Sequence, residues 1–316
     1  MIKPLIQIDI VLSIFNQENL IERILYSIFK NTITPFNLIL VFDGCTDRTK
    51  PRALKYIKRY KAKNLKELII ADAPNVYETK ANNIGFKLAK NEHMITLQDD
   101  MVINEYGWER RLTYPLRKFE DVLAVTARIA QNINDLTNIN NEYTDSIGKE
   151  LNNLSRNIFA IRDVINRGPV AFNMYHLSKL NYLNENYAPS DLDDADLSLR
   201  AWEKYKLRVG VYYINYISPL YWSKGRSNES TMNVPVSIKR NSIKIMNDHK
   251  DYLETKIKHN DNILILEKEI DYLSSRYSIN NIFYIFCRPY RINRKATKYI
   301  ILRIKDFIRK VILYKI

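Results

Sequence analysis

The segment Ile39-Leu-Val-Phe-Asp-Gly-Cys-Thr-Asp47 joins an apolar run to a turn and then to residues that can begin a helix. The apolar run, Leu38–Phe42, has the length and composition of a buried strand. Asp43-Gly44 is a turn signal, and Thr46-Asp47 can cap a helix that we expect to run to about Tyr60. This stretch therefore predicts a strand, a turn and a helix in succession.

The same alternation extends along the N-terminal half on either side of this segment. Apolar runs with strand character alternate with stretches whose apolar residues recur at helical spacing. We expect strands at Ile8–Ile14, Glu67–Ala71 and Met94–Leu97, and helices around Leu20–Ile28 and at Thr79–Ala89. Such alternation is typical of βαβ units and a parallel sheet, and strands this apolar indicate a sheet covered on both faces.

The second half of the chain is less regular. Gln131–Asn157 is rich in Asn, Asp, Thr and Glu, which predicts a long polar excursion. An acidic cluster then opens an expected helix, and Lys206–Ile214 has the pattern of a strand. From about Val236 onward only helical periods are evident. We therefore expect one domain over residues 1–230 and a helical, basic extension over residues 231–316.

Composition excludes several classes of protein. With 316 residues, 46% of them hydrophobic and 27% charged, the chain has the make-up of a well-cored globular protein. Its 7 glycines exclude collagen-like chains and multi-glycine phosphate loops. Its 2 cysteines cannot build a disulfide framework or a cysteine-based zinc site, which favours a reduced, cytoplasmic compartment. We find neither a signal peptide nor an apolar run long enough to span a membrane.

The net charge of +14 is concentrated at the C-terminus. From Arg276 to Ile316 there are 11 Lys and Arg against one acid, so this tail carries +10. Lys298–Ile316 has a basic amphipathic pattern, which suits the surface of an anionic membrane and equally suits a helix packed on the body. A nucleic-acid partner ranks lower because no nucleic-acid-binding motif accompanies the charge.

Carboxylates follow two of the expected strands. Asp43 ends one, and Asp99-Asp100 end another, at the edge where open α/β sheets bind ligands. An Asp pair there suits Mg²⁺ or Mn²⁺, and it equally suits a turn that follows a buried strand. The acidic cluster Asp191–Asp196 is, by itself, more typical of a helix cap than of a catalytic base, because acids in a first helical turn complement the helix dipole.

Together these pieces resemble a family 2 glycosyltransferase of the GT-A fold. Six segments follow that family's motif order, over roughly residues 5–225. They are Ile10-Val-Leu-Ser-Ile-Phe-Asn16, Leu20–Thr32, Ile39–Asp47, Ala81-Asn-Asn-Ile-Gly85, Ile95-Thr-Leu-Gln-Asp-Asp-Met101 and Leu192-Asp-Asp-Ala-Asp-Leu-Ser-Leu-Arg200. The fold implied is α/β: a nucleotide-binding, mixed but mainly parallel sheet flanked by helices, with a helical C-terminal extension.

The chain departs from the family pattern at four places. Phe42 stands where a first acid of the base-contacting segment is usual, and Ser13 replaces a proline. Gln98 precedes the Asp pair where many members begin Asp-x-Asp. Tyr221–Gly225 lacks the histidine that many members place there, which leaves a third metal ligand in doubt.

The resemblance also implies roles for single residues. Asp100 and Asp99 would hold the divalent cation, Mn²⁺ or Mg²⁺, and Asp99, Asn16 and Asp43 would contact the donor. Asp194 would be the catalytic base, with Asp193 as second candidate, and direct displacement would invert the anomeric carbon. Arg200 would reach the diphosphate or, equally, pair with a neighbouring acid.

The function expected is transfer of a sugar from a nucleotide-sugar donor to a hydroxyl of a glycan or a lipid-linked acceptor, as in polysaccharide biosynthesis. Asp43 favours a UDP or dTDP sugar because it can accept a hydrogen bond from a pyrimidine ring N–H. The basic tail suits a peripheral location at the inner face of a membrane. The alternatives are a nucleotidyltransferase and a membrane- or nucleic-acid-binding scaffold recruited by the tail.

Overall fold

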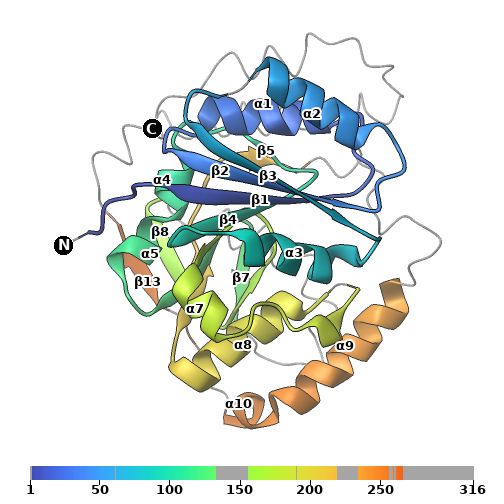
Figure 1. The fold of residues 1–316 in the computed structure, drawn as a ribbon. Coiled ribbons are helices and arrows are strands. Elements are labelled where there is room, and N and C mark those ends of the chain that lie inside the picture. Colours follow the sequence, from blue (N-terminus) through green and yellow to red (C-terminus); the bar gives the residue numbers. More distant parts are fainter. Residues whose placement is uncertain are drawn as a thin grey trace, which may run out of the picture. The chain divides into compact units, whose positions relative to one another are not determined.

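The computed structural model describes residues 2–60, 62–132, 156–189, 191–218, 234–255, 259 and 261–265 of the chain (Figure 1). These residues belong to the first of two compact units, Met1–Tyr277 and Ser278–Ile316. No helix within the described ranges is long and apolar enough to cross a membrane. The predicted boundary at 230/231, the segment Tyr221–Gly225, the basic tail and most of the polar excursion lie outside those ranges.

The N-terminal half alternates strand and helix as the sequence predicts. Its elements are β1 (Ile8–Ile14), α1 (Ile21–Asn31), β2 (Phe36–Asp43), α2 (Thr49–Arg59), β3 (Leu65–Ala73), α3 (Tyr77–Leu88) and β4 (His93–Gln98). Each predicted strand and helix of this half is present, with ends that differ by a few residues.

Shorter elements make up the remainder. They are β5 (Val102–Ile103), α4 (Trp108–Leu112), α5 (Tyr114–Lys118), β6 (Val122–Thr126), β7 (Ile129–Gln131), β8 (Ile158–Arg162), β9 (Val164–Asn166), β10 (Val170–Asn173), α7 (Met174–Lys179), a 3₁₀ turn (Glu185–Tyr187), α8 (Asp193–Tyr205), β11 (Arg208–Val211), β12 (Tyr216–Ile217), α9 (Val234–Asp248), α10 (Lys250–Thr255) and β13 (Asn262–Leu264).

The central sheet is mixed and has the strand order β13-β8-β11-β6-β10-β4-β1-β2-β3. Strands β4, β1, β2 and β3 run parallel to one another, whereas β10 pairs antiparallel with both β4 and β6. Two small antiparallel ribbons, β5 with β12 and β7 with β9, lie outside this sheet. The chain passes from β1 to β2 on one side and returns to β4 on the other, so the topological switch point lies between β1 and β4.

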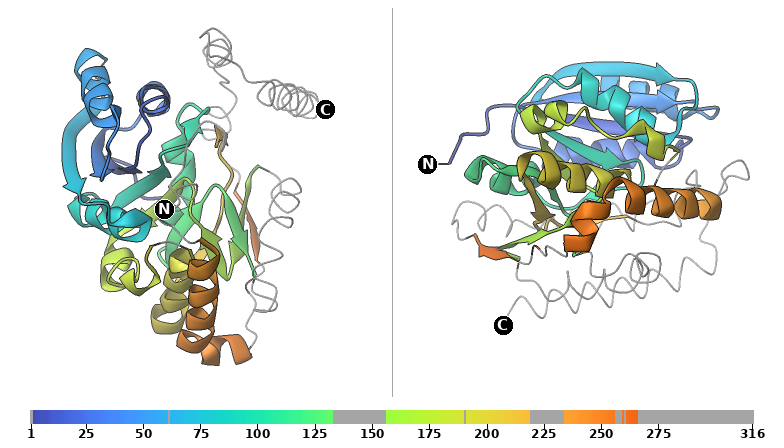
Figure 2. Two further views of the ribbon diagram at one scale, coloured as in Figure 1. Left: turned by 90° about the vertical axis from the view of Figure 1, so that its right-hand side faces the viewer. Right: turned by 90° about the horizontal axis from the view of Figure 1, so that it is seen from below.

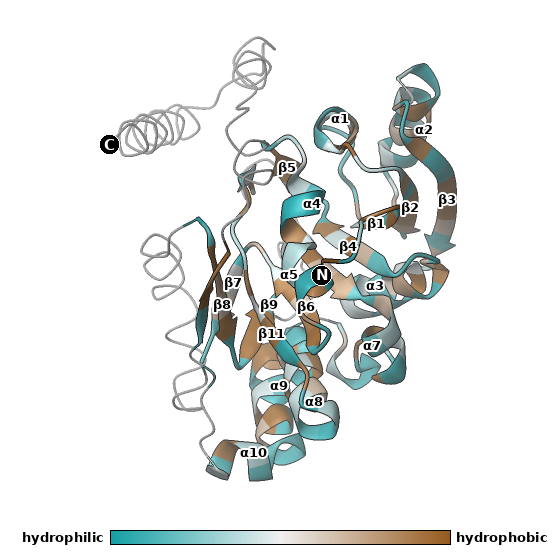
Figure 3. Cartoon of the chain, turned by 90° about the vertical axis from the view of Figure 1, so that its left-hand side faces the viewer, coloured by the Kyte–Doolittle hydropathy of each residue, from teal (hydrophilic) through white to brown (hydrophobic). Residues whose placement is uncertain are grey.

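Helices cover both faces of the sheet (Figures 1 and 2). Side chains alternate across each strand, so Ile10 and Leu12 of β1 join a core with α1, while Val11 joins one with α3 and α8. Burial on both faces explains why the strands are apolar throughout, and Figure 3 shows hydrophobic colour concentrated on them. The GT-A-like arrangement expected from the sequence is therefore confirmed.

The C-terminal part differs from prediction in two elements. The strand expected at Lys206–Ile214 spans only Arg208–Val211. A strand, β13, pairs with β8 in a region where only helical periods are evident in the sequence. Three residues are too few to establish a period, so a short edge strand of this kind leaves no pattern to detect.

Candidate active site

The candidate site lies at the carboxyl ends of β2, β1 and β4, which are neighbours in the sheet. Beyond β1, the backbone N–H of Phe15 donates to Oδ2 of Asp99 at 2.8 Å, across the switch point. Asn16 follows with a left-handed φ of 50°, a conformation that Asn tolerates better than most residues. Its Oδ1 accepts from the backbone N–H of Thr46 at 2.9 Å, which ties the end of β1 to the turn after β2.

Asp43, at the end of β2, is buried and fixes the loop before α3. Its Oδ1 accepts from the backbone N–H of Val76 at 2.6 Å, and its Oδ2 accepts from that of Tyr77 at 2.9 Å. Tyr77 has a φ of 68°, a costly conformation for an aromatic residue, which the two hydrogen bonds to Asp43 help to hold. Asp43 therefore has a structural role at this edge of the sheet, and its binding of a nucleotide stays a prediction.

Asp99 and Asp100 both have raised pKa values. Burial raises the pKa of Asp99 to about 7, against the opposing hydrogen bond from Phe15, and Asp100 and Glu78 add to the rise. Burial likewise raises the pKa of Asp100, although a hydrogen bond from Ser218 and the charge of Arg128 oppose the rise. Two neighbouring carboxylates that are costly to ionise suit a site completed by positive charge.

The β5–β12 ribbon positions a further group against Asp100. It brings Ser218, the residue after β12, to Asp99-Asp100, the predicted metal loop. There Oγ of Ser218 donates to Oδ2 of Asp100 at 2.8 Å. The other oxygen, Oδ1, is buried and accepts no hydrogen bond within the described residues. An orphaned carboxylate oxygen fits a cation, since Mg²⁺ and Mn²⁺ prefer oxygen ligands.

The predicted metal ligands number two. Among the described residues no group of three or more His, Cys, Asp or Glu side chains could hold a metal ion. Asp99 and Asp100 fit a cation whose remaining positions are taken by substrate phosphates and water, as is usual for Mg²⁺.

The two candidate bases open α8 and face a buried arginine. Arg167 donates from Nη2 to Oδ1 of Asp193 at 2.8 Å, and its Nε lies 4.0 Å from Oδ2 of Asp194. Both oxygens of Asp194 also accept backbone N–H groups, from Arg167 at 2.7 Å and from Ala195 at 2.8 Å. Oδ2 of Asp193 is buried and accepts no hydrogen bond from the described part of the chain.

Burial raises the pKa of both of these acids. The pKa of Asp193 rises to about 6 because burial outweighs the positive charge of Arg167, and the charge of Asp194 adds to the rise. The pKa of Asp194 is raised by burial too, against Arg167 and its two backbone hydrogen bonds. A carboxylate with a raised pKa is a better proton acceptor, as general base catalysis requires.

Polar contacts join the two groups of acids. Nη1 of Arg167 lies 3.5 Å from Oε1 of Glu78, and Glu78 accepts from Nε2 of Gln98 at 2.9 Å. Gln98 in turn accepts from Nη1 of Arg128 at 3.0 Å, and it directly precedes Asp99 in the chain. The predicted metal loop and the predicted base therefore belong to one polar network.

Sequence reasoning missed Glu78, Arg128, Arg167 and Ser218. Each acts through a partner from another element, so no local spacing identifies them. One signal was available: an isolated glycine often marks a close approach, and Gly168 lies next to Arg167 and against the side chain of Arg128.

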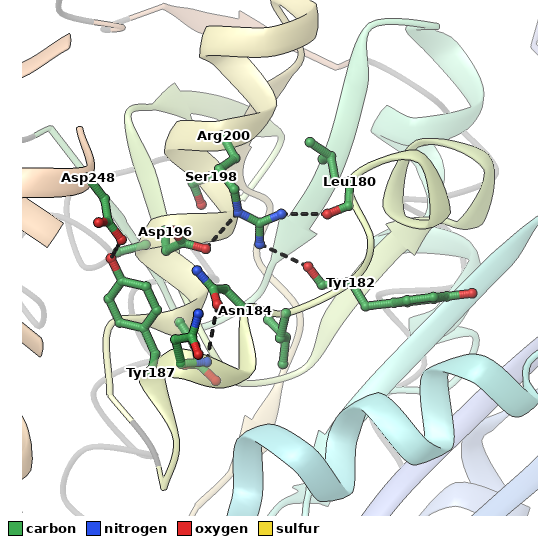
Figure 4. Close-up of polar contacts among 12 residues, drawn as sticks. Leu180, Tyr182, Asn184, Tyr187, Asp196, Ser198, Arg200 and Asp248 are labelled. Atoms are coloured by element: carbon green, nitrogen blue, oxygen red, sulfur yellow. Dashed lines mark hydrogen bonds and ion pairs between the residues drawn. The ribbon is translucent and has the colours of Figure 1, made fainter. Parts of the chain in front are cut away.

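Arg200 lies on α8, and its guanidinium points toward Asp196, Leu180 and Tyr182 (Figure 4). Its Nε donates to Oδ2 of Asp196 at 2.7 Å, and its Nη1 and Nη2 donate to the carbonyls of Leu180 and Tyr182 at 2.5 and 2.9 Å. Of the two roles expected for Arg200, the ion pair with a neighbouring acid is the one present. A contact with a diphosphate would require these three hydrogen bonds to break.

Comparison with known proteins identifies the family. A family model described as glycosyl transferase family 2 matches residues 9–177, which is more than half of the chain. The protein belongs to glycosyl transferase family 2. The matched region contains most of β1, all of β2 and β4, and the acids at the ends of β2 and β4. No curated protein sequence matches the chain.

Solved structures of glycosyltransferases have a similar fold. TarS from S. aureus has a TM-score of 0.50 and 14% identity, and the match covers 90% of this chain and 46% of that one. The mannosyltransferase PcManGT from Pyrobaculum calidifontis, solved with GDP-Man and Mn²⁺, has a TM-score of 0.48 and 15% identity, covering 66% and 57%. Glucosyl-3-phosphoglycerate synthase from Mycobacterium tuberculosis, solved with Mg²⁺ and UDP, has a TM-score of 0.46 and 16% identity, covering 68% and 73%. The chain thus spans about half the length of the first two.

Proposed function

We propose that this glycosyltransferase transfers a sugar from a nucleotide-sugar donor to a hydroxyl of a glycan or lipid-linked acceptor, with a divalent cation and with inversion. The observation that carries the proposal is the polar network that links the metal loop at the end of β4 to the acids of α8 through Arg167, Glu78 and Gln98. It provides carboxylates for both halves of a displacement reaction in one family 2 fold.

The donor end of the site is formed by Asn16, Asp43, Asp99 and Asp100. A cation held by Asp99 and Asp100 would supply Lewis-acid neutralisation of the leaving diphosphate. Asp43 is a hydrogen-bond acceptor at this edge of the sheet, and the ring N–H of uracil or thymine would be a suitable donor to a carboxylate. A UDP or dTDP sugar is the donor class that this arrangement favours.

The acceptor end is formed by the first turn of α8. Asp194 is the proposed base, with Asp193 as the second candidate, because Asp194 is 5% exposed whereas Asp193 is 0% exposed. A base that takes the proton from the attacking hydroxyl produces one-step displacement and therefore inversion. The positive charge of Arg167 stabilises the ionised form of both acids.

The association with a membrane rests on sequence alone. The basic pattern of Lys298–Ile316 lies outside the described residues, so the peripheral location remains a proposal for this chain. Sedimentation with vesicles of anionic and of neutral lipid would test it, and binding only to anionic vesicles is the expected result.

The experiment for the enzymatic proposal is a thermal-shift measurement with Mn²⁺ and UDP, dTDP, GDP or CMP, repeated with Asp100→Ala. We expect a metal-dependent rise in Tm with UDP or dTDP that the variant loses, together with loss of sugar transfer. A folded wild-type protein that responds to none of the four nucleotides would contradict the proposed donor site. Turnover that survives Asp100→Ala would contradict the proposed role of the metal loop.

A further inference from the structure

We propose that Arg128 binds phosphate oxygens of the donor diphosphate and shares with the cation the neutralisation of the leaving group. The inference rests on the proposed function, which it deepens by assigning a binding residue that the sequence motifs do not include. It starts from a guanidinium that the fold holds beside the metal loop.

The β7–β9 ribbon places Arg128 at this edge. Ile129 of β7 pairs with Asn166 of β9, so Arg128 and Arg167, one residue beyond each, emerge at the same end of the ribbon. Nη1 of Arg128 donates to the carbonyl of Arg167 at 3.1 Å and to Oε1 of Gln98 at 3.0 Å. Its backbone N–H donates to Oγ1 of Thr126 at 3.0 Å.

Gly168 provides the space for this conformation. A Cβ atom at Gly168 would lie 2.6 Å from Cβ of Arg128 and 3.2 Å from its Cδ. The stem of Arg128 therefore lies directly on the backbone of Gly168, and any larger residue would displace it. A side chain fixed by a glycine contact and two hydrogen bonds loses little further entropy when it binds a ligand.

Both hydrogen bonds described for the guanidinium leave from Nη1. In the described part of the chain, Nε and Nη2 of Arg128 donate to no protein group. The hydrogen bond to Gln98, the residue before Asp99-Asp100, holds the positive charge beside the predicted metal loop, where the diphosphate is expected to bind. An arginine with two unused N–H groups on one side of its fork suits bidentate binding of phosphate oxygens.

Gln98 explains why the charge of Arg128 stays available. An aspartate at this position, where many family members begin Asp-x-Asp, would pair with Arg128 and cancel its charge. The amide oxygen of Gln98 holds the guanidinium without neutralising it, and the amide nitrogen is itself held by Glu78. The departure from the family pattern at Gln98 and the position of Arg128 are thus two parts of one arrangement.

The test compares the affinity for UDP and for UMP in the presence of Mn²⁺, by calorimetry, in the wild type and in Arg128→Met. Loss of a charge-assisted bidentate contact is expected to weaken UDP binding by about tenfold to a hundredfold and UMP binding by much less. Arg208→Met is the control, because Arg208, the first residue of β11, forms an ion pair with Asp121. It should leave the affinity for UDP unchanged.

Gly168→Ala supplies a second variant that keeps every charge. It should weaken UDP binding in the wild-type background and have no further effect in the Arg128→Met background, because the glycine acts through the arginine. If the losses of UDP affinity caused by Gly168→Ala and by Arg128→Met add in the double variant, the glycine does not act through the arginine.

The outcomes separate this inference from the proposed function. A wild type that binds none of the donor nucleotides contradicts the proposed function itself. A wild type that binds UDP, with Arg128→Met binding it equally well, overturns only the inference. If Arg128→Met leaves the affinity for UDP unchanged and raises the KM for the acceptor, Arg128 binds the acceptor and not the donor diphosphate. That result would also overturn the inference.

Discussion

The first turns of α8 carry two clusters that combine aspartates with an arginine. In the Asp193–Asp194 cluster both acids meet Arg167; in the Asp196 cluster the aspartate meets Arg200 and His249. Asp196 has a partner for each oxygen, and Arg200 donates to one carboxylate and two carbonyls (Figure 4). In the Asp193–Asp194 cluster, Oδ2 of Asp193 is buried and accepts no hydrogen bond from the described residues. Nη1 of Arg167 is also buried and donates none to them, although it lies 3.5 Å from Oε1 of Glu78.

The difference shows how one helix separates structure from chemistry. A buried network in which each charge has its partners stabilises one conformation, as the Asp196 cluster does where α8 meets His249. A buried network with unused acceptors and acids of raised pKa costs stability and retains the capacity to bind a ligand or a proton. Both clusters consist of aspartate and arginine, so only their hydrogen bonds distinguish them.

The largest expected effect is a loss of turnover when the Asp193–Asp194 cluster is changed. Asp194→Asn removes the proposed base, so kcat should fall by about 10²- to 10⁴-fold. Asp193→Asn retains the acceptor that Arg167 uses and places an amide where Oδ2 accepts nothing, so a smaller loss is expected. Initial rates on folded protein measure both, and a larger loss in Asp193→Asn would make Asp193 the base.

Asp196→Asn is the matched control in the Asp196 cluster of the same helix. It should leave kcat of the folded fraction near the wild-type value and lower the free energy of unfolding, because Asp196 bridges Arg200 and His249. A loss of kcat in Asp196→Asn comparable to that in Asp194→Asn would mean that the two clusters do not differ in function.

The next effect is on stability, at Arg200. Arg200→Met would leave the carboxylate of Asp196 and two carbonyls without their donor, and we expect the free energy of unfolding to fall by about 3–5 kcal/mol. Denaturant titration measures this change. Arg208→Met breaks an ion pair in which Asp121 is half exposed and should cost only about 0–1 kcal/mol. Equal losses in the two variants would contradict a structural role for the Arg200 contacts.

The sequence predicted the strands and the acids at their ends because both depend on local pattern. Ile8–Ile14 is apolar along its whole length, and Asp43, Asp99 and Asp100 each follow such a run directly. It did not predict Arg128, Arg167 or Ser218, since each reaches its partners through pairing of short ribbons that have no period of their own. The two roles of Arg200 were indistinguishable in sequence, because they depend on the carbonyls of Leu180 and Tyr182.

The smallest effect expected is a pH dependence of stability that comes from His249, a member of the Asp196 cluster. Its ring is 2% exposed and lies 2.8 Å from Glu203 and 3.1 Å from Asp196. Burial alone would lower the pKa of His249, but the two carboxylates outweigh it and the pKa is raised. A raised folded-state pKa means that the protonated ring adds stability that is fully present below about pH 6.5, the unfolded value, and is lost as pH rises through the folded value.

The stability of the wild type relative to His249→Gln should therefore be greatest below about pH 6.5 and should shrink above it. Urea titrations of both proteins at a series of pH values measure the difference, in which titrations common to the two proteins largely cancel. A wild-type advantage that grows with rising pH would mean that His249 is buried neutral. The ring of His249 would then contribute only neutral hydrogen bonds to the Asp196 cluster, and the two clusters of α8 would differ in charge as well as in hydrogen bonding.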